Sequence, residues 1–174
     1  FNYAENVSAA DKAVKMCRIN VNAAAINIRE MALNNDTSSY NDYELTVEKL
    51  LTDVDSQLQI IKKSGVLSEA DYNEYSSYLS QWGNIGYSII ENIKKGNKDK
   101  ATEEILNKCT PALNKVVEKA ISLDDIADKE SRKAAIVTFI FAVAGVVCII
   151  VCLSTAWVLA KRISRKCWQR LLHH

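Results

Sequence analysis

Four segments of the chain repeat apolar residues at alternating intervals of four and three, as an amphipathic helix with one buried face does. In the first segment these positions are Tyr3, Val7, Ala10, Val14, Cys17, Val21, Ala24, Ile28 and Met31. In the second they are Val47, Leu50, Val54, Leu58 and Ile61. The third has Tyr75, Leu79, Trp82, Gly86, Ile89 and Ile93, and the fourth has Leu106, Cys109, Leu113, Val116, Ala120, Leu123 and Ala127. We therefore predict four helices.

Short stretches of turn-forming residues separate these segments. Residues 34–42 read NNDTSSYND, and the second segment stops at KKSG, residues 62–65. Ser68, with Asp71 three positions later, has the spacing of a helix N-cap. The third segment ends at KKGN, where Gly96 is the expected terminator.

Four helices with short connections predict an all-α fold, an antiparallel up-down-up-down four-helix bundle. In that topology residues 1 and 133 lie at the same end of the bundle. One proline and five glycines in 174 residues also disfavour a fold rich in turns and strands.

Residues 134–160 contain no charged residue, and about 20 apolar residues are enough to cross a bilayer. We predict a transmembrane helix there. Trp157 at its end, followed by Lys161 and Arg162, is typical of an interfacial anchor.

The five basic residues after the apolar run have no acidic residue among them, so the positive-inside rule predicts a cytoplasmic segment at 161–174. The helical domain of residues 1–133 is then extracellular, and its export requires an upstream signal or membrane helix. No turn signal separates the fourth segment from the span, which predicts one continuous helix with Pro111 as its only breaker, bending its upper part.

Composition excludes several functions. Residues 1–133 carry 17 basic and 21 acidic residues, a formal charge of −4, which argues against nucleic-acid binding. The two histidines are the last two residues, and no metal-ligand spacing or phosphate-binding loop is present, so we predict no metal, no cofactor and no catalysis. The acidic cluster Asp124, Asp125, Asp128 and Glu130 is interpreted as a solvated face.

The five cysteines do not form a disulfide framework. Cys17 and Cys109 lie on apolar stripes, but their predicted stagger along the bundle is roughly 9 Å at about 1.5 Å per residue, too far for a disulfide. We expect two small buried thiols.

Three stretches resemble the sensor region of bacterial methyl-accepting chemotaxis proteins. RINVNAAAINIREMALNND (18–36) is similar to the first sensor helix of many such receptors, and the last sensor helix runs directly into the span. LAKRISRK (159–166) resembles the entrance to a HAMP linker, although Lys166 stands where the family usually has proline. The resemblance implies a homodimer that binds a small extracellular ligand, shifts its last helix and regulates cytoplasmic signalling partners.

Family sensors often hold amino acids or dicarboxylates at the dimer interface through arginines of the first helix. The resemblance therefore makes Arg18, Asn22 and Arg29 candidate ligand residues, together with Thr110 in the membrane-distal half of the last helix. Arg18 flanks the apolar stripe, whereas Arg29 falls nearer solvent. The alternatives are a solvated helix edge for the first three and a plain helix kink at Thr110-Pro111.

Small residues recur every four positions within the span, at Ala144, Cys148, Cys152 and Ala156. Such spacing permits close helix packing in lipid, although chance in a run rich in small residues explains it equally well.

Other functions remain open from the sequence. The same input can serve a histidine kinase or a cyclic-dinucleotide enzyme. A tail-anchored docking protein with a cytoplasmic bundle, or a structural bundle without a ligand, is the alternative from another class.

Overall fold

The computed structural model describes residues 3–171, with side chains through Arg162. The helices are α1 (Tyr3–Leu33), η1 (Thr37–Ser39), α2 (Tyr40–Ser64), α3 (Glu69–Lys94), α4 (Lys98–Glu104), the π-helix η2 (Ile105–Cys109) and α5 (Thr110–Leu171). No strand occurs in this part of the chain. The chain divides into two compact units, residues 1–132 and 133–174, so α5 contributes to both.

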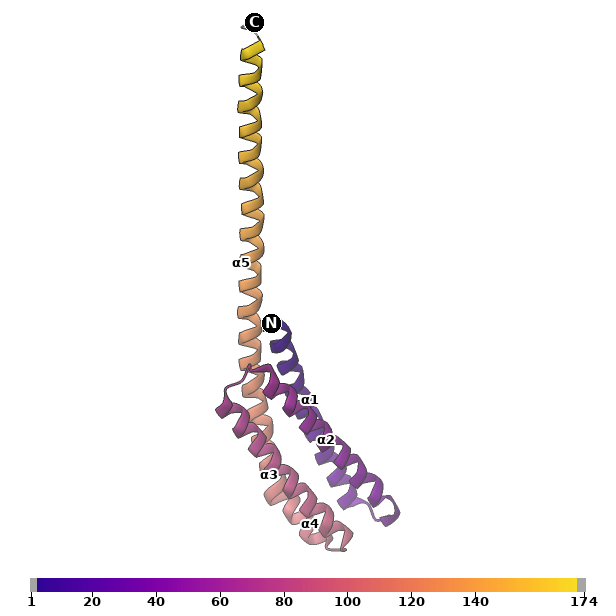
Figure 1. Cartoon of the computed structure of the whole chain (residues 1–174). Coiled ribbons are helices and arrows are strands. Elements are labelled where there is room, and N and C mark those ends of the chain that lie inside the picture. The colour runs from indigo at the N-terminus through magenta and orange to yellow at the C-terminus, as the bar shows by residue number, and fades with distance from the viewer. Residues whose placement is uncertain (1–2, 172–174) are drawn as a thin grey trace. The chain divides into compact units, whose positions relative to one another are not determined.

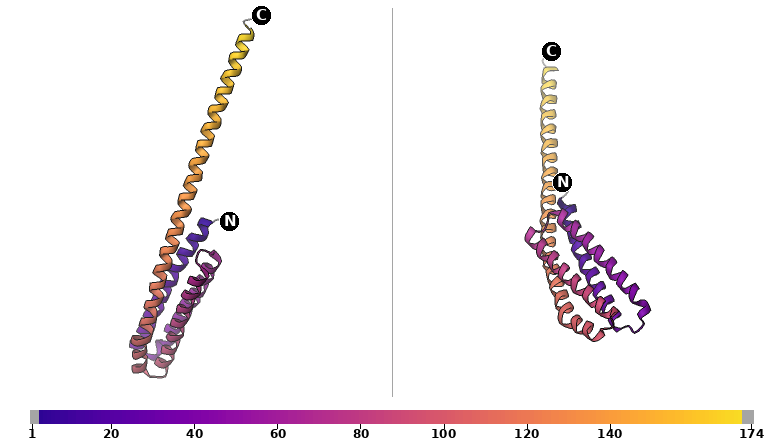
Figure 2. Two further views of the ribbon diagram at one scale, coloured as in Figure 1. Left: turned by 90° about the vertical axis from the view of Figure 1, so that its left-hand side faces the viewer. Right: turned by 60° about the horizontal axis from the view of Figure 1, so that its bottom comes forward.

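Residues 3–132 form an antiparallel four-helix bundle, which confirms the predicted all-α fold. Its fourth helix consists of α4, η2 and the first part of α5. Figures 1 and 2 show α1 and α2 as one antiparallel pair, with α3 and α4 as a second. The Tyr3 hydroxyl donates to Glu130 Oε2 at 2.6 Å, so the start of α1 lies beside the end of the bundle segment of α5.

The helix ends follow the local signals in the sequence. Ser68 Oγ accepts from the Asp71 amide at 3.1 Å, as expected for the N-cap of α3. Gly65 and Gly96 have φ angles of 64° and 80°, in the left-handed region that favours glycine, and they follow α2 and α3. The turn predicted at 34–42 is shorter than expected, because α2 already begins at Tyr40. That side chain is buried, and its hydroxyl donates to the Asn34 carbonyl at 2.9 Å.

The predicted apolar stripes form most of the core, although Leu50 is only partly buried. All the predicted positions on α1 are buried except Tyr3, and all six on α3 are buried. The two helices approach closely at Gly86, where a Cβ atom would meet Ile28 Cδ1 at 3.0 Å. Cys17 and Cys109 are buried free thiols, which confirms the prediction for this pair.

The predicted inward position of Leu106 is wrong, because this side chain is 64% exposed. In a regular α-helix Leu106, three residues before the buried Cys109, would lie on the same face as Cys109. The π-helix adds a residue to this turn, and Ile105 takes the buried position instead. Pro111 is the second residue of α5, two positions after the last residue of this π-helix. Because its ring cannot accommodate the carbonyl four residues earlier in a regular helix, the wider turn relieves that clash.

The second unit contains an apolar helix. In the described residues, one helix is long and apolar enough to cross a membrane, and its most apolar window contains none of the buried residues. The secondary structure of α5 passes without a break through the predicted span at 134–160.

Candidate functional site

Three of the four residues predicted to bind a ligand, Arg18, Arg29 and Thr110, make contacts across the seam between α1 and the fourth helix. Arg29 Nη2 donates to Thr110 Oγ1 at 3.4 Å, so the structure brings two of them together. Arg18 instead pairs with Asp124, its Nη1 atom lying 3.1 Å from Oδ2. Asn22 Nδ2 donates to the Arg18 carbonyl at 2.8 Å, a bond within one helix that leaves its side-chain oxygen available. The seam thus holds two separate polar contacts.

Asp124 is the partner that the sequence analysis did not identify. Its side chain is only 14% exposed, so its assignment to a solvated acidic face is wrong. Asp124 follows the buried Leu123 just as Arg18 follows the buried Cys17. Each residue thus comes directly after a buried residue of its own apolar stripe. Because the two stripes face each other, this shared position could have indicated the pair.

The surroundings of Asp124 are poor in compensating groups. Its Oδ1 atom is buried and has no hydrogen-bond partner among the described residues. Burial raises the pKa of Asp124, whereas the positive charges of Arg18 and Lys15 act in the opposite direction. The neighbouring Tyr75 hydroxyl is also buried without a partner, and burial raises its pKa. Arg18 is therefore engaged in stabilising a partly buried carboxylate.

Arg29 has a different environment from Arg18. Its contact with Thr110 is partly buried, although the register placed Arg29 nearer solvent. Thr110 Oγ1 also donates to the Ile105 carbonyl at 2.8 Å, which fixes the hydroxyl inside the π-turn. Among the described residues, Arg29 has no carboxylate within ion-pair distance. This guanidinium can therefore accept an anion.

An exposed apolar stripe lies on α1 beside this seam. Ile19, Ile26 and Leu33 recur every seven residues and are 56%, 52% and 82% exposed. Leu106 and Ile121 on the fourth helix are also exposed. We name Ile19, Ile26 and Leu33 the outer stripe. The outer stripe was not predicted, because the stronger buried stripe already accounted for the helix.

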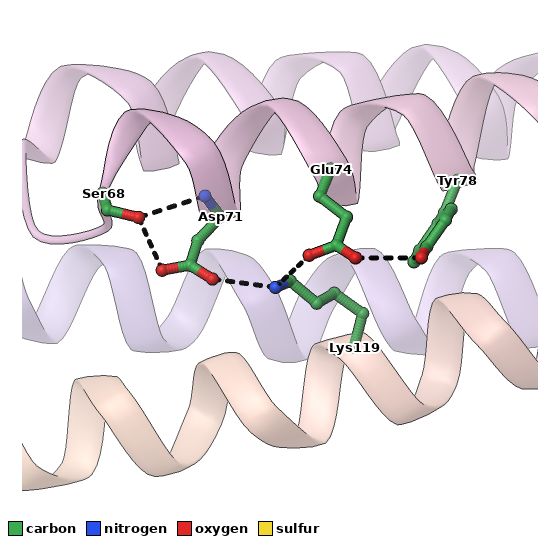
Figure 3. A network of polar contacts seen from close by, with 5 residues as sticks. All are labelled: Ser68, Asp71, Glu74, Tyr78 and Lys119. Atoms are coloured by element: carbon green, nitrogen blue, oxygen red, sulfur yellow. Dashed lines mark hydrogen bonds and ion pairs between the residues drawn. The ribbon is translucent and has the colours of Figure 1, made fainter.

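A second polar cluster ties α3 to α5 (Figure 3). Lys119 Nζ donates to Asp71 Oδ1 at 2.8 Å and to Glu74 Oε2 at 2.5 Å. Ser68 Oγ and the Tyr78 hydroxyl donate to the remaining oxygens of these carboxylates at 2.6 and 2.9 Å. The hydrogen bonds from Lys119 lower the pKa of Asp71 and of Glu74, and both carboxylates raise the pKa of Lys119. We call this set the Lys119 cluster.

In the second unit, α5 carries the residues predicted to anchor and pack the span. Trp157 is 65% exposed, and Lys161 Nζ lies 4.8 Å from the centroid of its ring. Arg162 is exposed as well. The packing positions are Ala144, Cys148, Cys152 and Ala156, and both cysteines are free and exposed. Their packing against another membrane helix stays a prediction.

An antiparallel bundle of four helices, continued by an apolar helix, is the architecture of a helical sensory module. The chain belongs to the family described as a four helix bundle sensory module for signal transduction, whose sequence model matches residues 12–138. This confirms the resemblance to the sensor domain of methyl-accepting chemotaxis proteins. The family is a sensory module and not an enzyme domain. Comparison with curated proteins and with solved structures found no match.

Proposed function

We propose that this chain is the input region of a transmembrane chemoreceptor that binds a small extracellular ligand and signals to cytoplasmic partners. One observation carries the proposal: α5 supplies Thr110, Lys119 and Asp124 to the bundle and also contains the apolar run at 134–160. Thr110, which contacts the proposed ligand residue Arg29, and the proposed membrane span thus belong to the same helix.

The charge distribution supports an orientation in the cell membrane. Five basic residues and no acidic residue follow the apolar run, which favours a cytoplasmic location for residues 161–174. The bundle then lies outside the cell.

The ligand we propose is a small carboxylate or an amino acid, bound beside Arg29. A guanidinium binds a carboxylate through two parallel hydrogen bonds, and Arg29 has no internal carboxylate partner in the described chain. Thr110 adds a hydroxyl beside Arg29, and Asn22 offers an unused amide oxygen on the same helix as Arg29. Arg18 has a supporting role, because its charge is already paired with Asp124.

The partner we propose for the outer stripe is a second copy of this chain. About half or more of each residue in the outer stripe, Ile19, Ile26 and Leu33, is exposed. Apolar residues repeated every seven positions are the pattern through which two helices pack together. A homodimer joined along α1 buries the stripe and places two copies of Arg29 near the interface.

The ligand site can be tested with the full chain in lipid nanodiscs. A panel of amino acids and dicarboxylates is screened by thermal shift, and any hit is titrated calorimetrically against wild type, Arg29→Gln and Arg132→Gln. We expect binding to wild type and to Arg132→Gln, with affinity at least about tenfold lower in Arg29→Gln. Equal affinity in all three proteins would exclude Arg29 as the ligand contact.

A further inference from the structure

A cavity of about 380 Å³ lies where the α1–α2 and α3–α4 connections come together. It is lined by Thr37, Tyr40, Asn41, Ile93, Lys94, Gly96 and Lys98. We propose that this cavity, which we call the turn pocket, is a second ligand site that binds a small carboxylate with an apolar or aromatic body. The site lies within one chain, is separate from Arg29 and does not depend on the dimer.

The polar lining of the turn pocket selects an anion. Its side chains include two ammonium groups, one amide and the hydroxyls of Thr37 and Tyr40, and no carboxylate. Lys94 pairs with Glu44 at 2.5 Å, so its charge is largely compensated. Lys98 has no carboxylate partner among the described residues, which leaves it as the main positive charge of the pocket.

Lys98 is held in place by neutral oxygens. Its Nζ atom donates to the Asn34 carbonyl at 2.5 Å and to Asn35 Oδ1 at 3.2 Å, and it lies 5.7 Å from the centroid of the Tyr40 ring. An ammonium group has three donors, so one remains for an added acceptor. Because the other two fix its position, a bound carboxylate meets an ammonium whose conformational entropy has already been lost.

Two further side chains in the pocket have unused hydrogen-bonding groups. In the part of the chain that the structure describes, neither Asn41 nor Thr37 makes a side-chain hydrogen bond. Both can donate to a carboxylate without breaking an existing contact. The anion site therefore combines one charged donor with two neutral donors.

The remaining wall of the pocket is apolar. Tyr40 and Ile93 are 6% and 1% exposed, so they form a fixed surface continuous with the core. A purely ionic ligand would leave this surface wet, whereas an aliphatic or aromatic body would cover it. The cavity volume lies within the range of about 300–1,000 Å³ that is typical of small-molecule sites.

A ligand in the turn pocket would join the two helical pairs. Thr37, Tyr40 and Asn41 belong to the α1–α2 side, whereas Ile93, Lys94, Gly96 and Lys98 belong to the α3–α4 side. Polar contacts that already join these sides there include Lys94–Glu44 and Lys98–Asn34. Occupation would therefore favour the arrangement in which both sides are closed on the ligand.

Glycine-selective ¹⁵N labelling gives a direct test, because the chain has only five glycines. The full chain in phosphatidylcholine nanodiscs is titrated with benzoate, and with benzyl alcohol as the uncharged control. We expect a saturable shift of the Gly96 amide, which lies in the pocket, and none of Gly65, which follows the other end of α2. Benzyl alcohol should produce no saturable shift of Gly96.

Variants separate the turn pocket from the Arg29 site. Lys98→Met removes the charge, and Asn41→Asp adds a repelling carboxylate at a side chain that makes no hydrogen bond of its own. Each should weaken benzoate binding by about tenfold or more. Lys100→Met, an exposed lysine of α4 outside the pocket, and Arg29→Gln should bind benzoate as wild type does.

Three outcomes would overturn the turn pocket. The first is a Gly96 signal that does not move when benzoate is added. The second is a benzoate affinity, measured from the Gly96 shift, that is unchanged in both Lys98→Met and Asn41→Asp. The third is loss of the Gly96 shift in Arg29→Gln. Unshifted Gly65 resonances in the unliganded variants, relative to wild type, show that the bundle is intact. Failure of the Arg29 site leaves these Gly96 results unchanged, so the two proposals are tested independently.

Discussion

Arg18 and Asp124 face each other across the seam between α1 and α5, with Nη1 and Oδ2 3.1 Å apart and side chains 33% and 14% exposed. The carboxylate is the more buried partner, and its second oxygen has no hydrogen bond in the described chain. The pair therefore compensates a buried charge on the helix that continues into the apolar run.

Arg18→Met should destabilise the bundle by about 1–3 kcal/mol, because it leaves a largely buried carboxylate without a counter-ion. Thermal and denaturant unfolding of the full chain measure the loss, with the exposed Arg132→Met as the matched control. The double variant Arg18→Met/Asp124→Leu should recover part of the loss, since no charge remains buried. If the double variant loses the sum of the two single effects, the residues do not interact.

The stability deficit of Arg18→Met should depend on pH. Burial already raises the pKa of Asp124, and removal of Arg18 takes away a charge that opposes the rise. When the pKa of a carboxyl group is higher in the folded protein than in the unfolded chain, the free energy of unfolding decreases as pH rises through the folded-state pKa. The deficit should therefore grow as pH rises from acidic values through the raised pKa of Asp124 toward neutral pH. Melting temperatures of both proteins at acidic and at neutral pH provide the comparison.

The Lys119 cluster should respond to pH in the opposite direction. Lys119 holds the pKa values of Asp71 and Glu74 below their usual range, so its contribution is present at neutral pH and is lost as pH falls through those lowered values. Lys119→Met should lower stability only modestly at neutral pH, since both carboxylates are partly solvated. Lys119→Met should lose less stability than wild type does when pH falls from neutral to strongly acidic values. Circular dichroism measures this loss, with the exposed Lys115→Met as the control. Parallel pH profiles in all three proteins would contradict this.

The proposed dimer makes a prediction for the outer stripe. Ile26→Glu places a charge in the middle of the stripe and should shift the full chain in nanodiscs from dimer to monomer by mass photometry. Ile60→Glu is the matched control, because Ile60 is a 40% exposed isoleucine on α2, outside the stripe. If Ile26→Glu and Ile60→Glu have the same mass distribution, the outer stripe is not the contact between copies.

The π-helix predicts where a deletion is tolerated. Removing the exposed Asn107 converts the wide turn into a regular one and preserves the burial of Ala101 and Ile105. Removing the exposed Lys115 from regular helix rotates all preceding residues by about 100° relative to the core. In a Pro111→Ala background, which removes the ring clash, the first deletion should unfold at a markedly higher temperature than the second. Similar unfolding temperatures would show that the π-turn does not set the register.

Most of the fold could be predicted from the apolar repeats, because a buried stripe on each helix determines which face packs inward. The stripes on α1 and α3 were predicted almost residue by residue. Leu106 was not, because one added residue in a helical turn changes the phase and leaves no mark in composition. The same limit applies at any helix whose pitch changes locally.

The candidate site could be predicted only in part. The sequence indicated the charged and polar residues. The heptad register of a helix predicts which side chains flank its apolar stripe, but it does not predict which of them contact each other across two helices. Thus Arg29 and Thr110 could be named separately, whereas Asp124 was missed as the partner of Arg18. The turn pocket depends on two connections about 60 residues apart in sequence, and no periodicity brings such connections together.

The last prediction concerns transmission through α5. Inserting Gly-Gly between Arg132 and Lys133, in the whole receptor, should abolish the cytoplasmic response because two flexible residues interrupt the helix between the bundle and the apolar run. Ligand affinity should stay unchanged, since the Arg29 site lies in the first unit. The matched control inserts seven alanine-rich residues, which keep the helix and return it to nearly the same rotation, and should retain a response. A normal response from the Gly-Gly variant would show that a signal does not travel through a rigid α5.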